Sequence, residues 1–303
     1  MVSHFGSTTR GFLEHTPKTR ELPARAKKLW EHLYREEVLE DLDFKTYRPM
    51  RDISDIEELV ARKATACIAT SLGVKRELVE SGVNSEQIHV IHNAIEDYWF
   101  ESSPRETLPT QIVFLGRLGN DTFTLRLKGL DRLAEVYAAF PKVKKATICM
   151  TTNQKLKAWM RKSFEHQEMF VNLRKDLIPQ VLAPRFGSIL FIPSRYEGFS
   201  LSLAEGMSQG LIPVSYPVGV APEIIRHGEN GFLVNSNTAA IRHMKELLAS
   251  PKLRERMALS AQETAQRFRS DYIASSLLDL YRKLKWEQKN LRKQNGKQIV
   301  DQS

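Results

Sequence analysis

The chain has 303 residues, enough for two modest domains or one large one, and its hydrophobic content of 42% excludes a globally disordered polymer. Its 45 lysines and arginines against 36 acidic residues give a net charge of +9, which predicts an anionic partner: a nucleotide diphosphate, an acidic lipid surface or nucleic acid. Cys67 and Cys149 lie in apolar runs without metal-ligand spacing, so we expect neither a disulfide framework nor a metal site.

The N-terminal stretch MVSHFGSTTRGF has no apolar core of the kind found in secretion signals, and no run approaches the roughly 18 apolar residues of a membrane-spanning helix. We therefore expect a cytoplasmic protein. Attachment to an anionic membrane surface on the inner face is a further hypothesis, based on the charge alone. A nucleic-acid partner is not expected, because no helix-turn-helix or aromatic RNA-binding signature accompanies the charge.

The first hundred residues mix short apolar runs with amphipathic segments. Residues 2–6 read as a short strand, and residues 23–42 read as a helix whose Trp30 and Tyr34 we expect to pack on a neighbouring lobe. Residues 53–95 then alternate helix, strand, helix and strand, which predicts a parallel sheet. Residues 97–109, with two prolines, read as an interdomain linker.

From residue 111 onward, strands and helices alternate strictly, as is typical of a doubly wound Rossmann-like domain. Such sheets bind ligands beyond the carboxyl ends of their strands, and Arg117, Asn172 and Glu197 each follow a predicted strand. The predicted strands are residues 111–118, 146–150, 169–173, 188–192, 212–216 and 231–234. After residue 237 the chain reads as helical to about residue 294, with a basic end.

Glu205 is the one charged residue of a small-residue helix that begins around Ser200 and follows a predicted strand. A buried carboxylate needs hydrogen-bond donors. Sugar or ribose hydroxyls would supply them, and a capping interaction or an arginine from elsewhere would serve equally well. The free backbone amides at the start of this helix suit a phosphate group, and they belong to Phe199, Ser200 and Leu201.

The run EGFSLSLAEGMSQGLIPVSYPVGVAPEIIRHGENGFLV resembles the nucleotide-sugar site of the retaining family-4 glycosyltransferases. It carries that family's Glu, seven residues, Glu signature in Glu197 and Glu205, and the upstream segment from Asn93 to Glu96 is similar to the family's Asn-Gly-Ile-Asp. The resemblance implies an α/β fold of GT-B type. It divides the chain into a partial N-terminal, acceptor-side lobe (1–103), a complete C-terminal Rossmann-like domain (104–270), and a crossing helix with a basic tail (271–303), of which residues 272–288 cross back to the first lobe.

The resemblance also implies roles for individual residues. Arg117 and Lys128 would hold the donor pyrophosphate without a metal; ten residues separate them, so Arg126 competes with Lys128 for the role. Glu197 would contact the donor hexose and Glu205 the ribose. The remaining donor contacts would come from Gly198, Phe199, Ser200 and Leu201, and those to the base from Asn172 and Leu173. His4 is a candidate for the acceptor side.

The expected function is therefore that of a retaining hexosyltransferase that uses a nucleotide sugar, with a UDP donor, to extend a surface glycan or glycolipid. In this family the departing phosphate assists deprotonation of the acceptor, so no covalent nucleophile is needed. The alternative is a truncated or split transferase that binds the donor and requires a partner chain for the missing N-terminal half. No cofactor is expected in either case.

Overall fold

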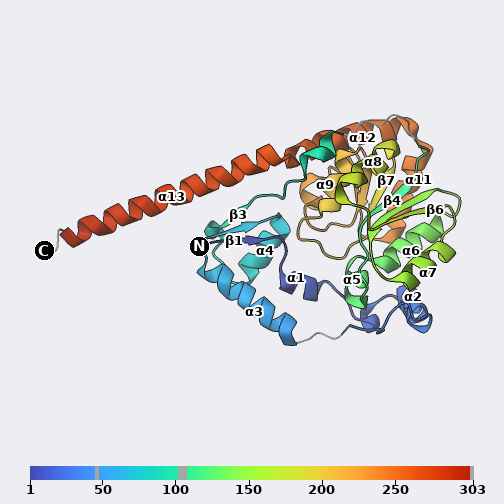
Figure 1. Cartoon of the computed structure of the whole chain (residues 1–303), viewed down its shortest axis with the longest axis horizontal. Helices are drawn as coiled ribbons and strands as arrows, with labels where there is room; N and C mark the ends of the chain where they lie inside the picture. Colours follow the sequence, from blue (N-terminus) through green and yellow to red (C-terminus); the bar gives the residue numbers. More distant parts are fainter. Residues whose placement is uncertain (45–47, 102–107, 301–303) are drawn as a thin grey trace.

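The computed structural model describes residues 1–44, 48–101 and 108–300, and Figure 1 shows two α/β lobes with a long C-terminal helix. The first lobe contains a parallel sheet of order β1-β2-β3, formed by β1 (Val2–Phe5), β2 (Ala66–Ala69) and β3 (Ile88–Val90). Its helices are α1 (Thr9–Glu14), α3 (Arg48–Lys63) and α4 (Leu72–Glu80). The predicted parallel sheet in this part of the chain is confirmed.

The second lobe is a six-stranded parallel sheet of order β6-β5-β4-β7-β8-β9, as the strict alternation predicts. Its strands are β4 (Ile112–Arg117), β5 (Lys145–Met150), β6 (Gln167–Val171), β7 (Ile189–Ile192), β8 (Ile212–Ser215) and β9 (Phe232–Leu233). Its helices are α5 (Thr122–Leu127), α6 (Leu130–Ala139), α7 (Gln154–Ser163), α8 (Ile178–Leu182), α9 (Leu201–Ser208), α10 (Ala221–Ile224), α11 (Asn237–Ala249) and α12 (Pro251–Ala265).

Both faces of the second sheet are covered, because alternate residues of each central strand enter opposite cores. In β4, Ile112 and Phe114 join one core with residues of α6, α7 and α11, whereas Val113 and Leu115 join the other with residues of α9. This double cover makes the second lobe a rigid support for the loops at the carboxyl ends of its strands.

Helix α2 (Ala24–Arg35) packs on the second lobe although it precedes most of the first lobe in the chain. Trp30 is completely buried there, which confirms the expected packing, while Tyr34 stays half-exposed. The helix ends at Arg35 instead of residue 42, because the next residues turn and Glu37 adopts a left-handed backbone with φ of 53°.

The predicted linker is partly core. Residues 97–100 form a 3₁₀ turn, η3 (Asp97–Phe100), whose Trp99 is completely buried against the second lobe. The aromatic residues of this segment indicate packing in a core, whereas the two prolines that follow are typical of a linker. The predicted domain boundary at residues 103 and 104 lies outside the described residues.

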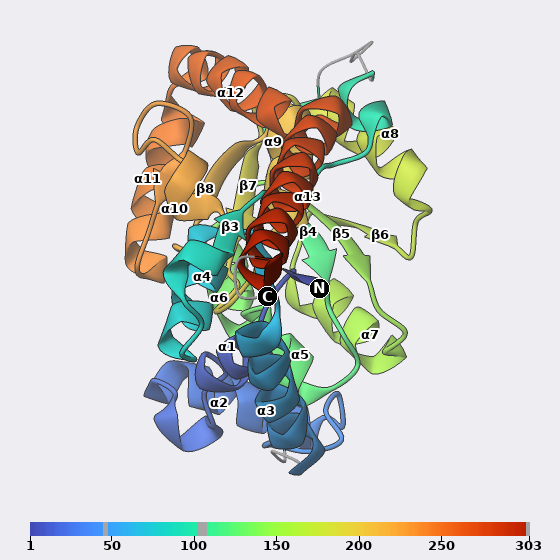
Figure 2. The same ribbon diagram turned by 90° about the vertical axis from the view of Figure 1, so that its left-hand side faces the viewer.

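The last helix, α13 (Ser270–Val300), leaves α12, passes the first lobe and extends beyond it (Figure 1); the turned view of Figure 2 shows its end toward the viewer. It contacts the first lobe through a hydrogen bond of 2.9 Å between His4 Nε2 and the Tyr281 hydroxyl. Within the described ranges, no helix combines the length and apolar character needed to cross a membrane.

Candidate functional site

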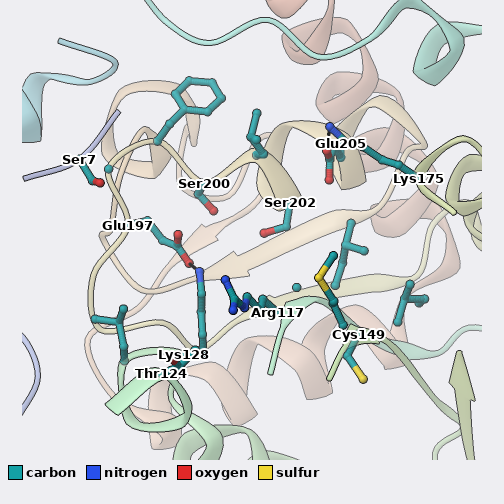
Figure 3. A pocket seen from close by; sticks show the side chains of 18 of the residues that line it. Ser7, Arg117, Thr124, Lys128, Cys149, Lys175, Glu197, Ser200, Ser202 and Glu205 are labelled. Carbon is teal, nitrogen blue, oxygen red and sulfur yellow. Dashed lines mark hydrogen bonds and ion pairs between the residues drawn. The ribbon is translucent and has the colours of Figure 1, made fainter. Parts of the chain in front are cut away.

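A cavity of about 750 Å³ opens between the two lobes, beyond the carboxyl ends of β4, β5, β6 and β7 (Figure 3). The second lobe supplies most of its wall, and the first lobe closes one side with Gly6, Ser7, Phe12 and Asn93. Its position agrees with the expectation that a doubly wound sheet binds ligands past its strand ends.

The cavity brings together ten of the eleven residues that the sequence indicates for the site. They are Arg117, Lys128, Asn172, Leu173, Glu197, Gly198, Phe199, Ser200, Leu201 and Glu205. His4 is the exception: its imidazole bonds to Tyr281 of α13, outside the cavity lining, and its role on the acceptor side stays a prediction. Strand alternation explains this, because Phe5 takes the inward position next to it.

One end of the cavity holds an ion pair between Glu197 and Lys128 (Figure 3). The Lys128 Nζ donates to Glu197 Oε1 at 2.6 Å, and the Ser194 hydroxyl donates to the same oxygen at 2.7 Å. Arg117 lies beside this pair, with no hydrogen-bond or ion-pair partner among the described residues. Lys128 and Arg117 thus both face the cavity, and the guanidinium of Arg117 is available to bind an anion.

The insertion between Arg117 and Lys128 folds as α5, which the sequence reading missed. Asp121 caps it: Oδ1 accepts the Thr124 amide at 2.8 Å, and the Thr124 hydroxyl donates to Oδ2 at 2.8 Å. An aspartate followed by Thr-Phe-Thr-Leu is the local signal for this cap. The short helix takes up the extra residues and ends at Leu127, directly before Lys128, so both cations still reach one cavity.

Arg126 does not compete for the anion, which corrects the second candidate for the Lys128 role. Its guanidinium is fully buried, donating to Asp43 Oδ1 at 2.7 Å, to the Thr19 hydroxyl at 2.9 Å and to two backbone carbonyls, and it packs over the Trp30 ring. Burial lowers its pKa, and the partner Asp43 opposes that shift. Arg126 therefore fastens the N-terminal segment around α2 to the second lobe.

Glu205 lies at the other end of the cavity and is 6% exposed. Burial raises the pKa of its carboxyl to about 7, although Lys175, whose Nζ lies 3.5 Å from Oε1, acts in the opposite direction. Lys175 also pairs with Glu96 at 2.5 Å, in the segment that follows β3. The partner of Glu205 is thus a lysine from elsewhere in the chain, and the second carboxylate oxygen can still accept hydroxyls.

Lys175 is the functional candidate that the sequence reading missed. It opens a short 3₁₀ turn, η4 (Lys175–Leu177), just beyond the end of β6. Its only sequence signal is a cation three residues after Asn172, and that signal is weak because Arg174 beside it points to Asp176 instead.

The start of α9 offers unsatisfied polar groups to the cavity. Ser200 precedes the helix in a left-handed conformation, with φ of 81°, and its buried hydroxyl has no partner among the described residues. The first amides of a helix also lack intrahelical partners and carry a partial positive charge; in α9 the amide of Leu203 already donates to the Ser200 carbonyl, and those before it precede this bond. A buried hydroxyl and free amides beside two cations form a site suited to a phosphate group.

Most of the cavity lies in a segment that matches a known protein family. The family model described as glycosyl transferases group 1 matches residues 95–264, which contain the second lobe and all of the cavity residues except those of the first lobe. D-inositol 3-phosphate glycosyltransferase from Streptomyces griseus is 36% identical over 99 residues, which are 32% of this chain and 21% of that protein. The chain therefore aligns with about a fifth of the length of this curated relative.

Solved structures resemble most of the fold at low sequence identity. Sucrose-phosphate synthase from Thermosynechococcus elongatus superimposes with a TM-score of 0.70 and 16% identity, covering 93% of this chain and 67% of that one. HepE from Anabaena, solved in complex with UDP, superimposes with a TM-score of 0.63 and 20% identity, covering 78% of this chain and 69% of that one. The two-lobed α/β fold expected from the sequence, that of the GT-B glycosyltransferases, is confirmed.

Proposed function

Because the chain belongs to the glycosyl transferases group 1 family, we propose that it is a retaining, family-4 glycosyltransferase. It transfers a hexose from a nucleotide-sugar donor, a UDP-sugar, to a glycan or glycolipid acceptor in the synthesis of a cell-surface polysaccharide. The UDP bound to the structurally similar HepE supports the choice of nucleotide. The residues on the cavity wall support the choice of reaction.

The observation that carries this proposal is the arrangement of charge within one cavity. Arg117 and Lys128 lie at the end where Glu197 projects, and Glu205 lies at the other end, with the start of α9 between them (Figure 3). A nucleotide sugar has matching parts: ribose hydroxyls, a diphosphate and a hexose. We assign the ribose to Glu205, the diphosphate to the two cations and the α9 amides, and the hexose hydroxyls to Glu197.

In the proposed reaction, the bond between the anomeric carbon and the leaving phosphate oxygen breaks while the acceptor oxygen attacks from the same face of the sugar. The acceptor proton passes to the departing phosphate, and the diphosphate takes the electron pair of the broken bond. Arg117, Lys128 and the helix dipole of α9 stabilise the charge that develops on the diphosphate. The proposal assigns no role to a covalent nucleophile or to a metal.

Titration calorimetry with UDP, GDP and ADP tests the donor assignment. We expect UDP to bind most tightly, and Glu205→Ala to weaken it about 10- to 100-fold, the range for a hydrogen bond to a charged group. Glu229→Ala is the matched control, because Glu229 is exposed and lies outside the cavity lining. A panel of UDP-hexoses incubated with membrane extract then tests transfer. No nucleotide binding, together with no hydrolysis or transfer, would contradict the proposal.

A second proposal concerns a partner chain and rests on the first sheet. Strand β1 lies at the edge of that sheet, with no strand beyond it among the described residues. Open edges present unpaired backbone groups that another chain can bind. A partner could therefore complete the acceptor side. If the purified chain transfers sugar alone at the rate seen in extract, this alternative is wrong.

A further inference from the structure

The loop between β7 and α9 carries Glu197, and its neighbour Tyr196 is inserted into the first lobe. The Tyr196 hydroxyl accepts the backbone amide of Thr8 at 3.1 Å and donates to Glu77 Oε2 at 2.8 Å. The Thr8 hydroxyl donates to the same Glu77 oxygen at 2.5 Å. The phenol is 5% exposed, so these bonds form away from solvent, where an unmade hydrogen bond is costly.

Aromatic packing holds the same ring. His15 stacks on Tyr196 with ring centroids 5.2 Å apart, and Phe12 meets its edge at 5.1 Å. Both residues come from α1 and the position just after it. The ring of Tyr196 is therefore enclosed by side chains of the first lobe, although the residue belongs to a loop of the second.

The residues after Glu197 also contact the first lobe. At Gly198 a Cβ atom would lie 1.8 Å from the Gly6 carbonyl oxygen, so the two backbones touch and only glycine fits. The Phe199 ring faces the His92 ring, with centroids 5.9 Å apart, and His92 in turn pairs with Glu223 at 2.9 Å. Tyr196 and Gly198 are thus docked on the first lobe, whereas Phe199 packs in the core of the second lobe and meets the first lobe at His92.

Glu197 lies between these docked residues, but its own bonds go to Lys128 and Ser194 of the second lobe, at 2.6 and 2.7 Å. The residues on either side of it, Tyr196 and Gly198, are held by the first lobe, and its carboxylate is held by the second. We propose that Tyr196 is a positioning residue, through which the first lobe sets the conformation of the 196–199 turn and so directs Glu197 toward Lys128. The docking itself requires no ligand, whereas its effect on donor binding rests on the proposed function.

Hydrogen–deuterium exchange of the ligand-free protein tests the docking. The reporters are the amides of Leu203, which donates to the Ser200 carbonyl at 3.1 Å, and of Val220, which donates to the Phe199 carbonyl at 2.8 Å. In Tyr196→Phe and in Glu77→Ala we expect both amides to exchange about tenfold faster, as the loss of a buried hydrogen bond predicts. Glu77 belongs to α4 and lies outside the cavity lining, so its effect must cross between the lobes.

Matched controls separate docking from general stability. Tyr137→Phe removes another buried phenol hydroxyl, bonded to Thr147 at 3.0 Å inside the second lobe, and Glu80→Ala removes an exposed carboxylate of α4. We expect both controls to leave the exchange of Leu203 and Val220 unchanged. Unchanged exchange in Tyr196→Phe and Glu77→Ala, or equal acceleration in Tyr137→Phe, would overturn the proposal.

UDP titration of the same four variants tests the effect on the site. We expect Tyr196→Phe and Glu77→Ala to weaken UDP binding about three- to tenfold, with both controls at the wild-type affinity. Faster exchange without weaker UDP binding would overturn the positioning role. If the wild type binds no nucleotide, the proposed function fails, while the exchange data still decide whether the first lobe holds the turn.

Discussion

The Lys128 ammonium lies 2.6 Å from the Glu197 carboxylate, so the cation assigned to the diphosphate and the acid assigned to the hexose are hydrogen-bonded to each other. Each is partly exposed to the cavity, with 21% and 14% of its side chain accessible. The pair fixes the direction of both groups before a donor enters. A diphosphate that binds here must share Lys128 with Glu197. The contribution of Lys128 to catalysis can be measured by replacing it.

Replacement of Lys128 by methionine removes the charge and keeps most of the side-chain length. We expect kcat/KM for the UDP-sugar to fall about 10²- to 10³-fold, the effect of losing one group that stabilises developing charge. Lys155→Met is the control, since Lys155 pairs with Glu37 on an exposed surface. Steady-state kinetics measure both variants. A similar loss in both, or no loss in Lys128→Met, would contradict the assignment.

The binding of UDP should depend on the ionisation of Glu205, whose pKa burial raises to about 7. Ribose hydroxyls donate to the ionised carboxylate, so the affinity for UDP should be highest about one pH unit or more above 7 and should decrease as the pH falls through 7. Between pH 8 and pH 6 we expect a decrease of about tenfold beyond that of Glu205→Gln. The phosphate groups of UDP change their protonation with pH in the same way for both proteins. The difference between the two pH profiles therefore reports the ionisation of Glu205. Parallel pH profiles for the two proteins would show that its charge does not matter.

Local patterns predicted the second lobe well because its central strands β4, β7 and β8 are mostly buried and appear as apolar runs between helices. The Glu197 to Glu205 spacing likewise indicated two acids near one helix start, and both line the cavity. This part of the site follows from residues that are close in the sequence, where periodicity and spacing carry the information.

The sequence could not predict contacts between distant segments. Arg126 and Lys128 are two residues apart and both are basic, yet one is buried under α2 and the other reaches the cavity. Their difference depends on where α5 ends and on Asp43, which is far away in the chain. Lys175 and Tyr196 were missed for the same reason, because their partners Glu205, Glu96 and Glu77 are distant in sequence.

Arg126→Met separates structural anchoring from phosphate binding. The guanidinium donates to Asp43 and to the carbonyls of Pro17 and Leu42, and its removal takes one donor from each of them. We expect the free energy of unfolding to fall by about 1–3 kcal/mol, the cost of lost buried hydrogen bonds, because the remaining Asp43 carboxylate is 42% exposed. UDP affinity, measured well below the melting temperature, should remain within about twofold of the wild type.

Asp43→Asn is the milder variant for the same question, because it keeps an oxygen acceptor for Arg126 while it removes the charge. It should lower stability by about 1 kcal/mol and leave UDP binding unchanged. Strong loss of nucleotide affinity in either folded variant would return Arg126 to the donor site.

Gly129 determines where Lys128 points, because it ends the α5 turn in a left-handed conformation with φ of 69°. A Cβ atom at this position would lie 2.2 Å from the Pro193 carbonyl oxygen, in the backbone that leads to Ser194 and Glu197. Gly129→Ala should therefore lower the free energy of unfolding by about 2–4 kcal/mol and weaken UDP binding by displacing Lys128. Gly187→Ala is the control for backbone strain alone: its φ is 73°, and no atom lies within 4 Å of the added carbon. That variant should cost about 1 kcal/mol and leave UDP affinity intact. Denaturant unfolding and UDP titration of both variants measure these effects, and equal stability losses with equal affinities would show that the contact with Pro193 does not position Lys128.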